Sequence, residues 1–257
     1  MEASRRRFEY LARLISKWGH CSRKEAERRV AAGRVTVNGV VRREVLWKVR
    51  AGRDRVGVDG AEIRPARLVH LKLHKPLGVV TTMKDPQGRP TVAALVPAKW
   101  RGVMPVGRLD RDSSGLLLLT NDHALGDQVA GPGHRVKKCY RVEVAGRPEE
   151  GVLEPIRAGI ELEGGERCRP AAVSIRARLE RSTRLEIVLD EGRFRQIRRS
   201  LAAVGLRVLA LHREKIGPIE LGDLAPGEVA PLSDAELAAL RRAAAPQPRP
   251  PRAPPRP

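Results

Sequence analysis

Gly107-Arg108-Leu109-Asp110-Arg111-Asp112-Ser113-Ser114-Gly115 leads directly into Leu116-Leu117-Leu118-Leu119-Thr120-Asn121-Asp122, and this is the most informative stretch of the sequence. Four consecutive leucines predict a strand that is buried on both faces. The polar loop before them holds two carboxylates between two glycines. Loops docked on a rigid buried strand often carry catalytic groups. An ordinary turn, in which Asp and Ser side chains cap backbone groups, accounts equally for this composition and is the commoner case.

Short β-rich runs surround this strand and predict the fold class. Gly and Pro separate them, and a few helical patterns lie between. We therefore expect an α+β protein whose larger domain, residues 68–240, is built on a mixed, largely antiparallel sheet with flanking helices. The runs that predict strands are 79–83, 116–120, 140–144, 173–176 and 185–189.

The N-terminal part predicts a smaller domain of its own. Apolar residues at helical spacing indicate a helix over residues 5–17, and a second helix follows from Ser22 to about Ala32. Asn38-Gly39 is a tight-turn dipeptide between two valine-rich runs, which predicts a hairpin. We expect a small α/β domain over residues 5–66, with residues 61–67 as the linker.

The charge is large and unevenly distributed. The chain has 257 residues and a formal net charge of +20, of which residues 1–67 carry +10. Such an excess favours a polyanionic partner, nucleic acid first and an anionic membrane surface second. Membrane insertion is disfavoured because no apolar run approaches about 18 residues. Cations crowd around the second helix and predict RNA binding, although a solvated helix face would look the same: Arg23, Lys24, Arg28 and Arg34.

Other compositional features exclude several classes. Three cysteines without metal-like spacing indicate a reduced, cytoplasmic protein that holds no metal. No glycine-rich nucleotide loop is present, so we expect no cofactor. Aromatic residues make up 3% of the chain, which disfavours a single-strand binder built from several stacking platforms. Residues 241–257 are rich in Pro and Arg and are expected to form a disordered tail.

Two further positions, Arg198 and Tyr140, are candidate site residues. In a helix starting near Arg193, Phe194, Ile197, Leu201 and Val204 would share the apolar face, and Arg198 would lie about 40° from Phe194. An arginine at this edge either meets a carboxylate or extends along its stem to solvent. Tyr140 lies in a predicted strand, where its ring either packs in the core or faces a pocket.

Two sets of motifs resemble known families. Ile15-Ser16-Lys17-Trp18-Gly19, Ser22–Glu27 and Gly33–Gly39 resemble the RNA-binding domain named after ribosomal protein S4. The remaining motifs resemble, in family order, the rRNA pseudouridine synthases that carry such a domain. They are Lys75–Gly78, Gly107–Asp122, Lys138–Val142, Arg169–Ala171, Glu191–Arg199, Ile216-Gly217 and Leu221–Glu228.

The resemblance implies a pseudouridine synthase domain and its site. The essential aspartate of the family matches Asp110, the pocket tyrosine matches Tyr140, and the arginine that pairs with the aspartate matches Arg198. His74 and Ser200 depart from the family pattern, where Asn and Met are common. Neither is one of the three matched positions.

The resemblance also implies the chemistry. A uridine leaves its stack, its N1–C1′ bond breaks and C5 joins C1′, without a cofactor. Asp110, kept ionised by Arg198, would act at the sugar, with 2′-proton abstraction through a glycal favoured over covalent attack. Tyr140 would stack on the uracil, and Lys75 and Arg108 could hold phosphates.

The expected partner is ribosomal RNA or a ribosomal subunit precursor, with the large subunit slightly favoured, and the expected state is a monomer. Two alternatives stay open. A non-catalytic ribosome-assembly protein on the same fold would have the same basic domain. A methyltransferase would need a cofactor pocket, and the sequence lacks the glycine-rich loop for one.

Overall fold

The computed structural model describes residues 8–21, 23–65, 67–100, 102–131, 133 and 135–245. The chain divides into two compact units. One contains the residues up to His70 together with segments 98–104 and 120–123, and the other contains the rest.

The first unit is built on helices α1 (Leu11–Lys17) and α2 (Arg23–Ala31) and two small antiparallel sheets. Its predicted hairpin is confirmed, with Asn38 and Gly39 both at positive φ. The expected linker 61–67 was wrong in part, because residues 61–63 pair into the four-stranded sheet. The strands are β1 (Phe8–Tyr10), β2 (Val35–Val37), β3 (Val40–Val41), β4 (Lys48–Arg50), β5 (Val56–Val58) and β6 (Ala61–Ile63).

The second unit is dominated by a nine-stranded mixed sheet with the main order β13-β14-β10-β15-β9-β7-β17. The predicted fold class is confirmed: β10 pairs antiparallel with β14 and β15, β13 with β14 and β17 with β7, whereas β15 pairs parallel with β9. The path strands are β7 (His70–Lys75), β9 (Ser114–Thr120), β10 (Lys138–Ala145), β13 (Ala172–Arg178), β14 (Ser182–Leu189), β15 (Val208–Ile216) and β17 (Val229–Pro231). Two short strands pair at its side, β8 (Met104–Val106) with β9 and β16 (Ile219–Glu220) with β15.

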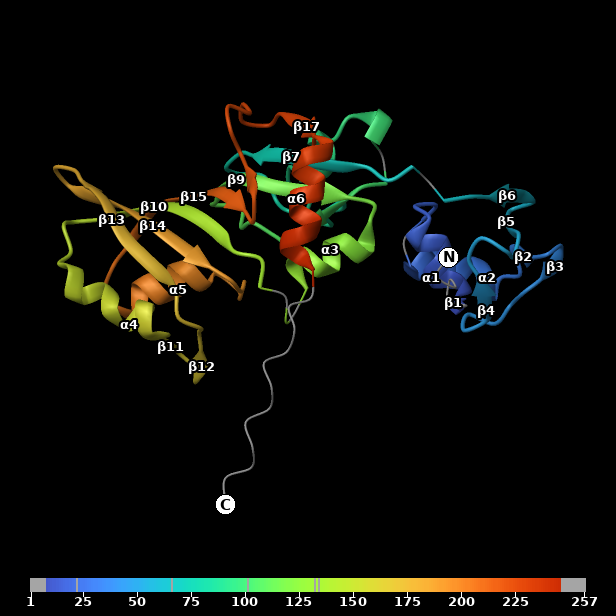
Figure 1. The fold of residues 1–257 in the computed structure, drawn as a ribbon, viewed down its shortest axis with the longest axis horizontal. Coiled ribbons are helices and arrows are strands. Elements are labelled where there is room, and N and C mark those ends of the chain that lie inside the picture. Colours follow the sequence, from blue (N-terminus) through green and yellow to red (C-terminus); the bar gives the residue numbers. More distant parts are fainter. Residues whose placement is uncertain are drawn as a thin grey trace, which may run out of the picture. The chain divides into compact units, whose positions relative to one another are not determined.

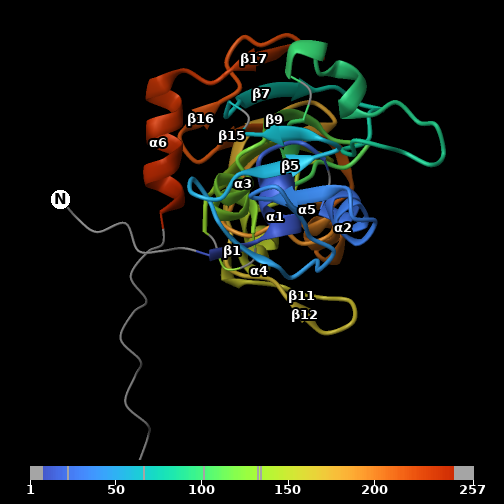
Figure 2. The same ribbon diagram turned by 90° about the vertical axis from the view of Figure 1, so that its right-hand side faces the viewer.

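Helices cover the sheet in two groups. The helices α4 (Glu154–Ala158) and α5 (Gln196–Ala203) lie along β10, β13 and β14, where Ile156 and Leu201 join a core with Val142 (Figure 1). The helices α3 (His123–Ala130) and α6 (Asp234–Ala244) pack on a second core that contains Leu116 and Leu118. Figure 2 shows α6 beside β16.

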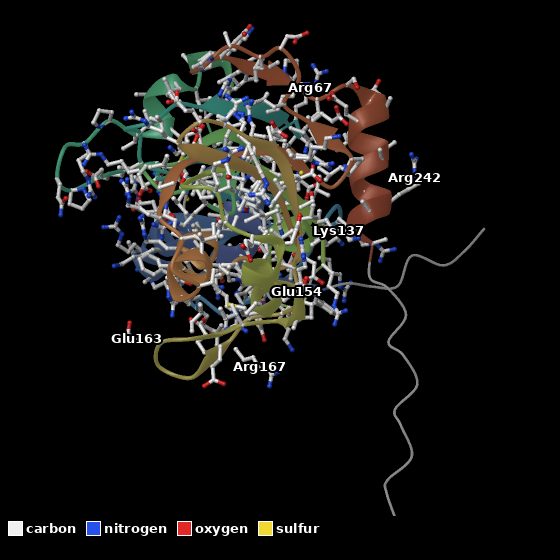
Figure 3. The ribbon with its side chains drawn as sticks, turned by 90° about the vertical axis from the view of Figure 1, so that its left-hand side faces the viewer. Arg67, Lys137, Glu154, Glu163, Arg167 and Arg242 are labelled. Atoms are coloured by element: carbon white, nitrogen blue, oxygen red, sulfur yellow. The ribbon has the colours of Figure 1, made fainter. Side chains whose placement is uncertain are left out.

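Smaller elements complete the second unit. The hairpin of β11 (Glu161–Leu162) and β12 (Glu166–Arg167) extends from the sheet, and Figure 3 shows Glu163 and Arg167 on it. The short helical turns are η1 (Val92–Leu95), η2 (Ala98–Trp100) and η3 (Glu150–Leu153). No helix among the described residues is long and apolar enough to cross a membrane.

The leucine strand is buried as predicted. Leu116, Leu117, Leu118 and Leu119 are each at most 2% exposed in β9. Where β9 begins, Gly115 faces Arg213 of β15, and a Cβ on this glycine would lie 2.3 Å from the Arg213 carbonyl oxygen. A glycine is therefore required at this seam.

Two sequence-based expectations were wrong. Residues 79–83 form no strand, because Val80 makes only an isolated bridge to Thr91. We expected the tail to begin at residue 241, but α6 continues to Ala244, whose side chain is buried. A capping box at Ser233 and Glu236 starts that helix. The remainder of the expected tail, residues 246–257, lies outside the described residues.

Candidate active site

The loop that carries Asp110 is fixed by its backbone. Leu109 is buried, and its N–H and C=O both bond the Thr81 hydroxyl, at 3.2 and 2.7 Å. The Gly78 N–H donates to the Arg111 carbonyl at 2.8 Å. The Asp110 carboxylate stays 27% exposed. The loop thus holds an accessible carboxylate on a rigid base, and Thr81 is a supporting residue that sequence analysis missed.

Lys75 lies beneath the same loop. Its side chain is fully buried, and Nζ donates to the Ser113 and Pro76 carbonyls at 2.7 and 2.9 Å. Burial lowers the pKa of Lys75 to about 8, although the nearby Asp110 and Asp112 carboxylates act to raise it. The expectation that Lys75 holds an RNA phosphate was wrong, because the ammonium is directed at backbone carbonyls inside the protein.

Two arginines meet the carboxylates of the loop, in a pairing that differs from our expectation. Arg198 lies with Nε 3.3 Å from Asp112 Oδ2, and its Nη2 donates to the Asp112 carbonyl at 2.6 Å. Among the described residues, the ion pair to Asp110 comes from Arg195, at 3.7 Å. Arg195 also donates hydrogen bonds to both carboxylate oxygens of Asp112, at 2.7 and 3.1 Å. The hydrogen bond from Arg195 lowers the pKa of the Asp112 carboxyl.

The start of α5 explains the change of partner. The helix begins at Gln196 and not near Arg193, because Arg195 adopts a left-handed backbone conformation at φ 48°. This turn directs the Arg195 guanidinium to the loop. It also removes Phe194 from the helix, so that Phe194 is 74% exposed where we expected it to be buried. Ile197 and Leu201 are buried as expected.

Tyr140 stands on β10 opposite Arg213 of β15. The ring is 9% exposed, and the Arg213 guanidinium carbon lies 6.0 Å from its centroid. Arg213 is itself buried, and its Nε donates to the Leu116 carbonyl at 2.7 Å. Its Nη2 has no hydrogen-bond partner among the described residues. Arg213 was missed by sequence analysis, because an arginine in a β pattern predicts an exposed position.

A cavity of about 390 Å³ joins these groups. Its volume lies within the range of about 300–1,000 Å³ that is usual for small-molecule sites. Asp110, Tyr140 and Arg198 all line it, so the structure brings the three matched residues to one place. Arg108, also expected here, lines the cavity with an exposed side chain. Four more cations line its wall: Lys138, Arg193, Arg195 and Arg213.

The basic positions of the first unit form a separate surface. Arg23, Lys24, Arg28 and Arg34 are all exposed, on α2 or just after it. Each of the three arginines also pairs with an acid: Arg23 with Glu27 at 3.1 Å, Arg34 with Asp59 at 2.5 Å, and Arg28 with Glu25. These pairs lie in water and contribute little to stability. The arginines therefore remain available to an anionic partner.

Known families match both units. A model described as RNA pseudouridylate synthase matches residues 69–203, and an S4 domain model matches residues 11–56. An RNA pseudouridine synthase of Aquifex aeolicus is 39% identical over 90% of this chain and 93% of its own. The large-subunit synthase B of Bacillus subtilis is 34% identical over 91% and 96% of the two chains.

Two further comparisons also match pseudouridine synthases. The small-subunit synthase A of Escherichia coli is 34% identical over 90% of this chain and 99% of its own. A pseudouridylate synthase crystal structure superposes with a TM-score of 0.66 and 28% identity, and covers 90% of this chain and 99% of that one. The chain therefore belongs to the RNA pseudouridine synthase family, as an isomerase with an N-terminal S4 domain.

Proposed function

We propose that this protein isomerises a specific uridine of ribosomal RNA to pseudouridine, with the target in the large subunit. The observation that carries the proposal is the single cavity that brings Asp110, Tyr140 and Arg198 together beside four further cations. Such a cavity suits a flipped nucleotide. An aromatic side chain can stack on its base, and cations can bind its anionic phosphates. The B. subtilis and E. coli relatives carry names that place them on the two ribosomal subunits.

The proposed residue roles combine this geometry with the family resemblance. Asp110 acts at C2′ of the target ribose: it takes the 2′ proton as the N1–C1′ bond breaks, and returns it to C2′ as C5 bonds C1′. The proton on C5 then leaves to solvent and N1 takes up one, so that the product is an isomer of uridine. Arg195, whose Nη1 lies 3.7 Å from Asp110 Oδ2, orients the carboxylate. Arg198 acts through Asp112, by fixing the backbone of the loop. Tyr140 stacks on the uracil, and Arg108, exposed at the cavity, binds a phosphate.

The S4 domain supplies binding energy in this proposal. Its exposed cations neutralise phosphates of structured RNA, with little reading of sequence. The protein then works as a monomer in the cytoplasm, and needs neither cofactor nor metal. A non-catalytic assembly protein would share this domain, so the test has to separate binding from turnover.

The variant Asp110→Asn separates RNA binding from turnover. The C5 hydrogen is lost when C5 joins C1′, so RNA labelled with tritium at C5 of uridine reports turnover. Wild-type protein should release tritium from large-subunit rRNA transcripts, and carbodiimide mapping should locate one new pseudouridine. We expect Asp110→Asn to lose at least about 1,000-fold in rate while its RNA affinity changes less than about three-fold. Release from small-subunit RNA alone would refute the subunit assignment, and no release from either would refute the rRNA proposal.

A further inference from the structure

Phe194 is an apolar side chain held in solvent beside the active site. It is 74% exposed, and it lines the same cavity as Asp110 and Tyr140. The chain has only two phenylalanines, so aromatic rings are scarce in it. Single exposed hydrophobic residues are common on protein surfaces. This one differs because the flanking chain is anchored on both sides.

The anchor on its N-terminal side is a pair of carboxylates. Arg193 donates from Nη1 to Glu166 at 2.8 Å and from Nε to Glu191 at 3.3 Å. Glu166 comes from the β11–β12 hairpin, and its second oxygen accepts from Arg199 at 2.6 Å. Two separate elements therefore fix the residue before Phe194.

The anchor on its C-terminal side is the left-handed turn. Arg195 is held there by its two hydrogen bonds to Asp112. Gln196 closes the segment, since its Nε2 donates to Glu191 at 2.7 Å and its Oε1 accepts from the Arg193 N–H at 3.1 Å. A non-glycine residue at positive φ persists only where its surroundings hold it. The ring is thus presented on a preorganised support.

We propose that Phe194 stacks on an RNA base next to the flipped uridine and fills the gap that the uridine leaves. Tyr140 is the buried aromatic residue of the cavity wall, at 9% exposure, whereas Phe194 is 74% exposed and is left for a neighbouring base. Every base has a π-face, and apolar side chains inserted at an opened base step replace the original stacking. The inference rests on the proposed rRNA substrate, and it makes Phe194 a positioning residue that helps to select the site.

Single-turnover tritium release from large-subunit rRNA transcripts tests the role of the ring. Phe194→Ala should lower kcat/KM by roughly 10- to 100-fold, while Phe194→Tyr and Phe194→Trp should stay within about three-fold of wild type. Leu209→Ala is the matched control, because Leu209 is also exposed and does not line the cavity. The midpoint of thermal unfolding should not change in any of these variants, because the Phe194 ring is in solvent.

A second readout locates the base that the ring touches. Transcripts substituted with 5-iodouridine and irradiated should crosslink to Phe194 in wild-type protein, at a nucleotide next to the modified one. Equal activity of Phe194→Ala and wild type would overturn the inference, as would full activity of Phe194→Leu, which is apolar without a π-face. Absence of tritium release by wild-type protein would instead refute the proposed substrate, so the two failures are distinguishable.

Discussion

At the scale of single residues, the site depends on which charged groups are buried and which stay in water. Asp110 keeps part of its surface exposed, whereas Lys75 beneath it is fully buried against two carbonyls. Both are charged residues of the matched motifs, so the sequence alone does not show which of them is buried. Burial makes Lys75 a support of the loop, whereas Asp110 stays accessible at the cavity.

Lys75 should make stability depend on pH. Its folded pKa of about 8 lies below the 10.5 of an ordinary lysine, so the unfolded chain binds more protons between these values and stability rises with pH there. Relative to Lys75→Met, the wild-type free energy of unfolding should gain up to about 3 kcal/mol from pH 8 to 10.5. Denaturant unfolding at several pH values measures this difference.

Lys84→Met is the control for that series, because Lys84 is exposed. Its difference from wild type should be constant over the same pH range. A Lys75→Met difference that is equally flat would contradict a lowered pKa in the folded state. At pH 7 we also expect Lys75→Met to be less stable than wild type by about 2 kcal/mol, because two buried carbonyls lose their donor.

At the scale of elements, the seam between β9 and β15 sets the position of the loop. The two strands pair parallel, and the seam joins Gly115 to Arg213 and Ser114 to His212. The Ser114 hydroxyl lies 2.9 Å from His212 Nδ1. Burial lowers the pKa of His212 to about 4, so this histidine is neutral at physiological pH. The close approach of β9 and β15 at this seam keeps the Asp110 loop at one end of the leucine strand.

Gly115→Ala should open this seam. The added Cβ would lie 2.3 Å from the Arg213 carbonyl oxygen, in a backbone conformation of φ +109° that side chains rarely adopt. We expect a loss of about 3 kcal/mol or more in the free energy of unfolding, together with lower activity. Chemical denaturation measures the first and tritium release the second.

Gly151→Ala is its control, since a Cβ at Gly151 meets no atom within 4 Å. It should change the unfolding free energy by less than about 0.5 kcal/mol. If Gly115→Ala were as mild as Gly151→Ala, the two strands would not need their close approach, and the loop would have to be held by other interactions.

At the scale of the whole molecule, binding and chemistry are assigned to separate units. Residues 1–67 carry +10 of the net charge of +20, whereas the cavity belongs to the larger unit. Because counterion release drives binding to phosphates, the contribution of each unit can be read from the salt dependence of RNA affinity.

Replacing four basic residues of the S4 domain should weaken binding without affecting chemistry. In the variant Arg23→Gln, Lys24→Gln, Arg28→Gln, Arg34→Gln, the slope of log affinity against log salt should fall by about 0.7–0.9 for each phosphate that the protein no longer neutralises. Its single-turnover rate at saturating RNA should equal that of wild type. Filter binding at several salt concentrations measures the slope.

The control variant removes four positive charges from the β13–β14 region, by the substitutions Arg176→Gln, Arg178→Gln, Arg181→Gln and Arg184→Gln. It should keep most of the wild-type slope. If the slope fell equally in both variants, the charge would act through the overall field of the protein, and the S4 domain would not be the preferred binding surface.

Sequence by itself determined the parts of this protein that depend on local pattern. Periodicity and turn chemistry predicted the Asn38-Gly39 hairpin and the buried leucine strand, and motif order predicted the family. These features follow from neighbouring residues. The cavity also gathers the three residues that the motifs singled out, Asp110, Tyr140 and Arg198.

Only the tertiary structure decided which groups meet inside that site. Arg195 replaced Arg198 as the partner of Asp110, and Phe194 moved from the expected core into solvent, both because one left-handed residue delays the start of α5. That conformation is held by Asp112, 83 residues away along the chain. An interaction over such a separation leaves no local period in the sequence, so no pattern could have predicted it.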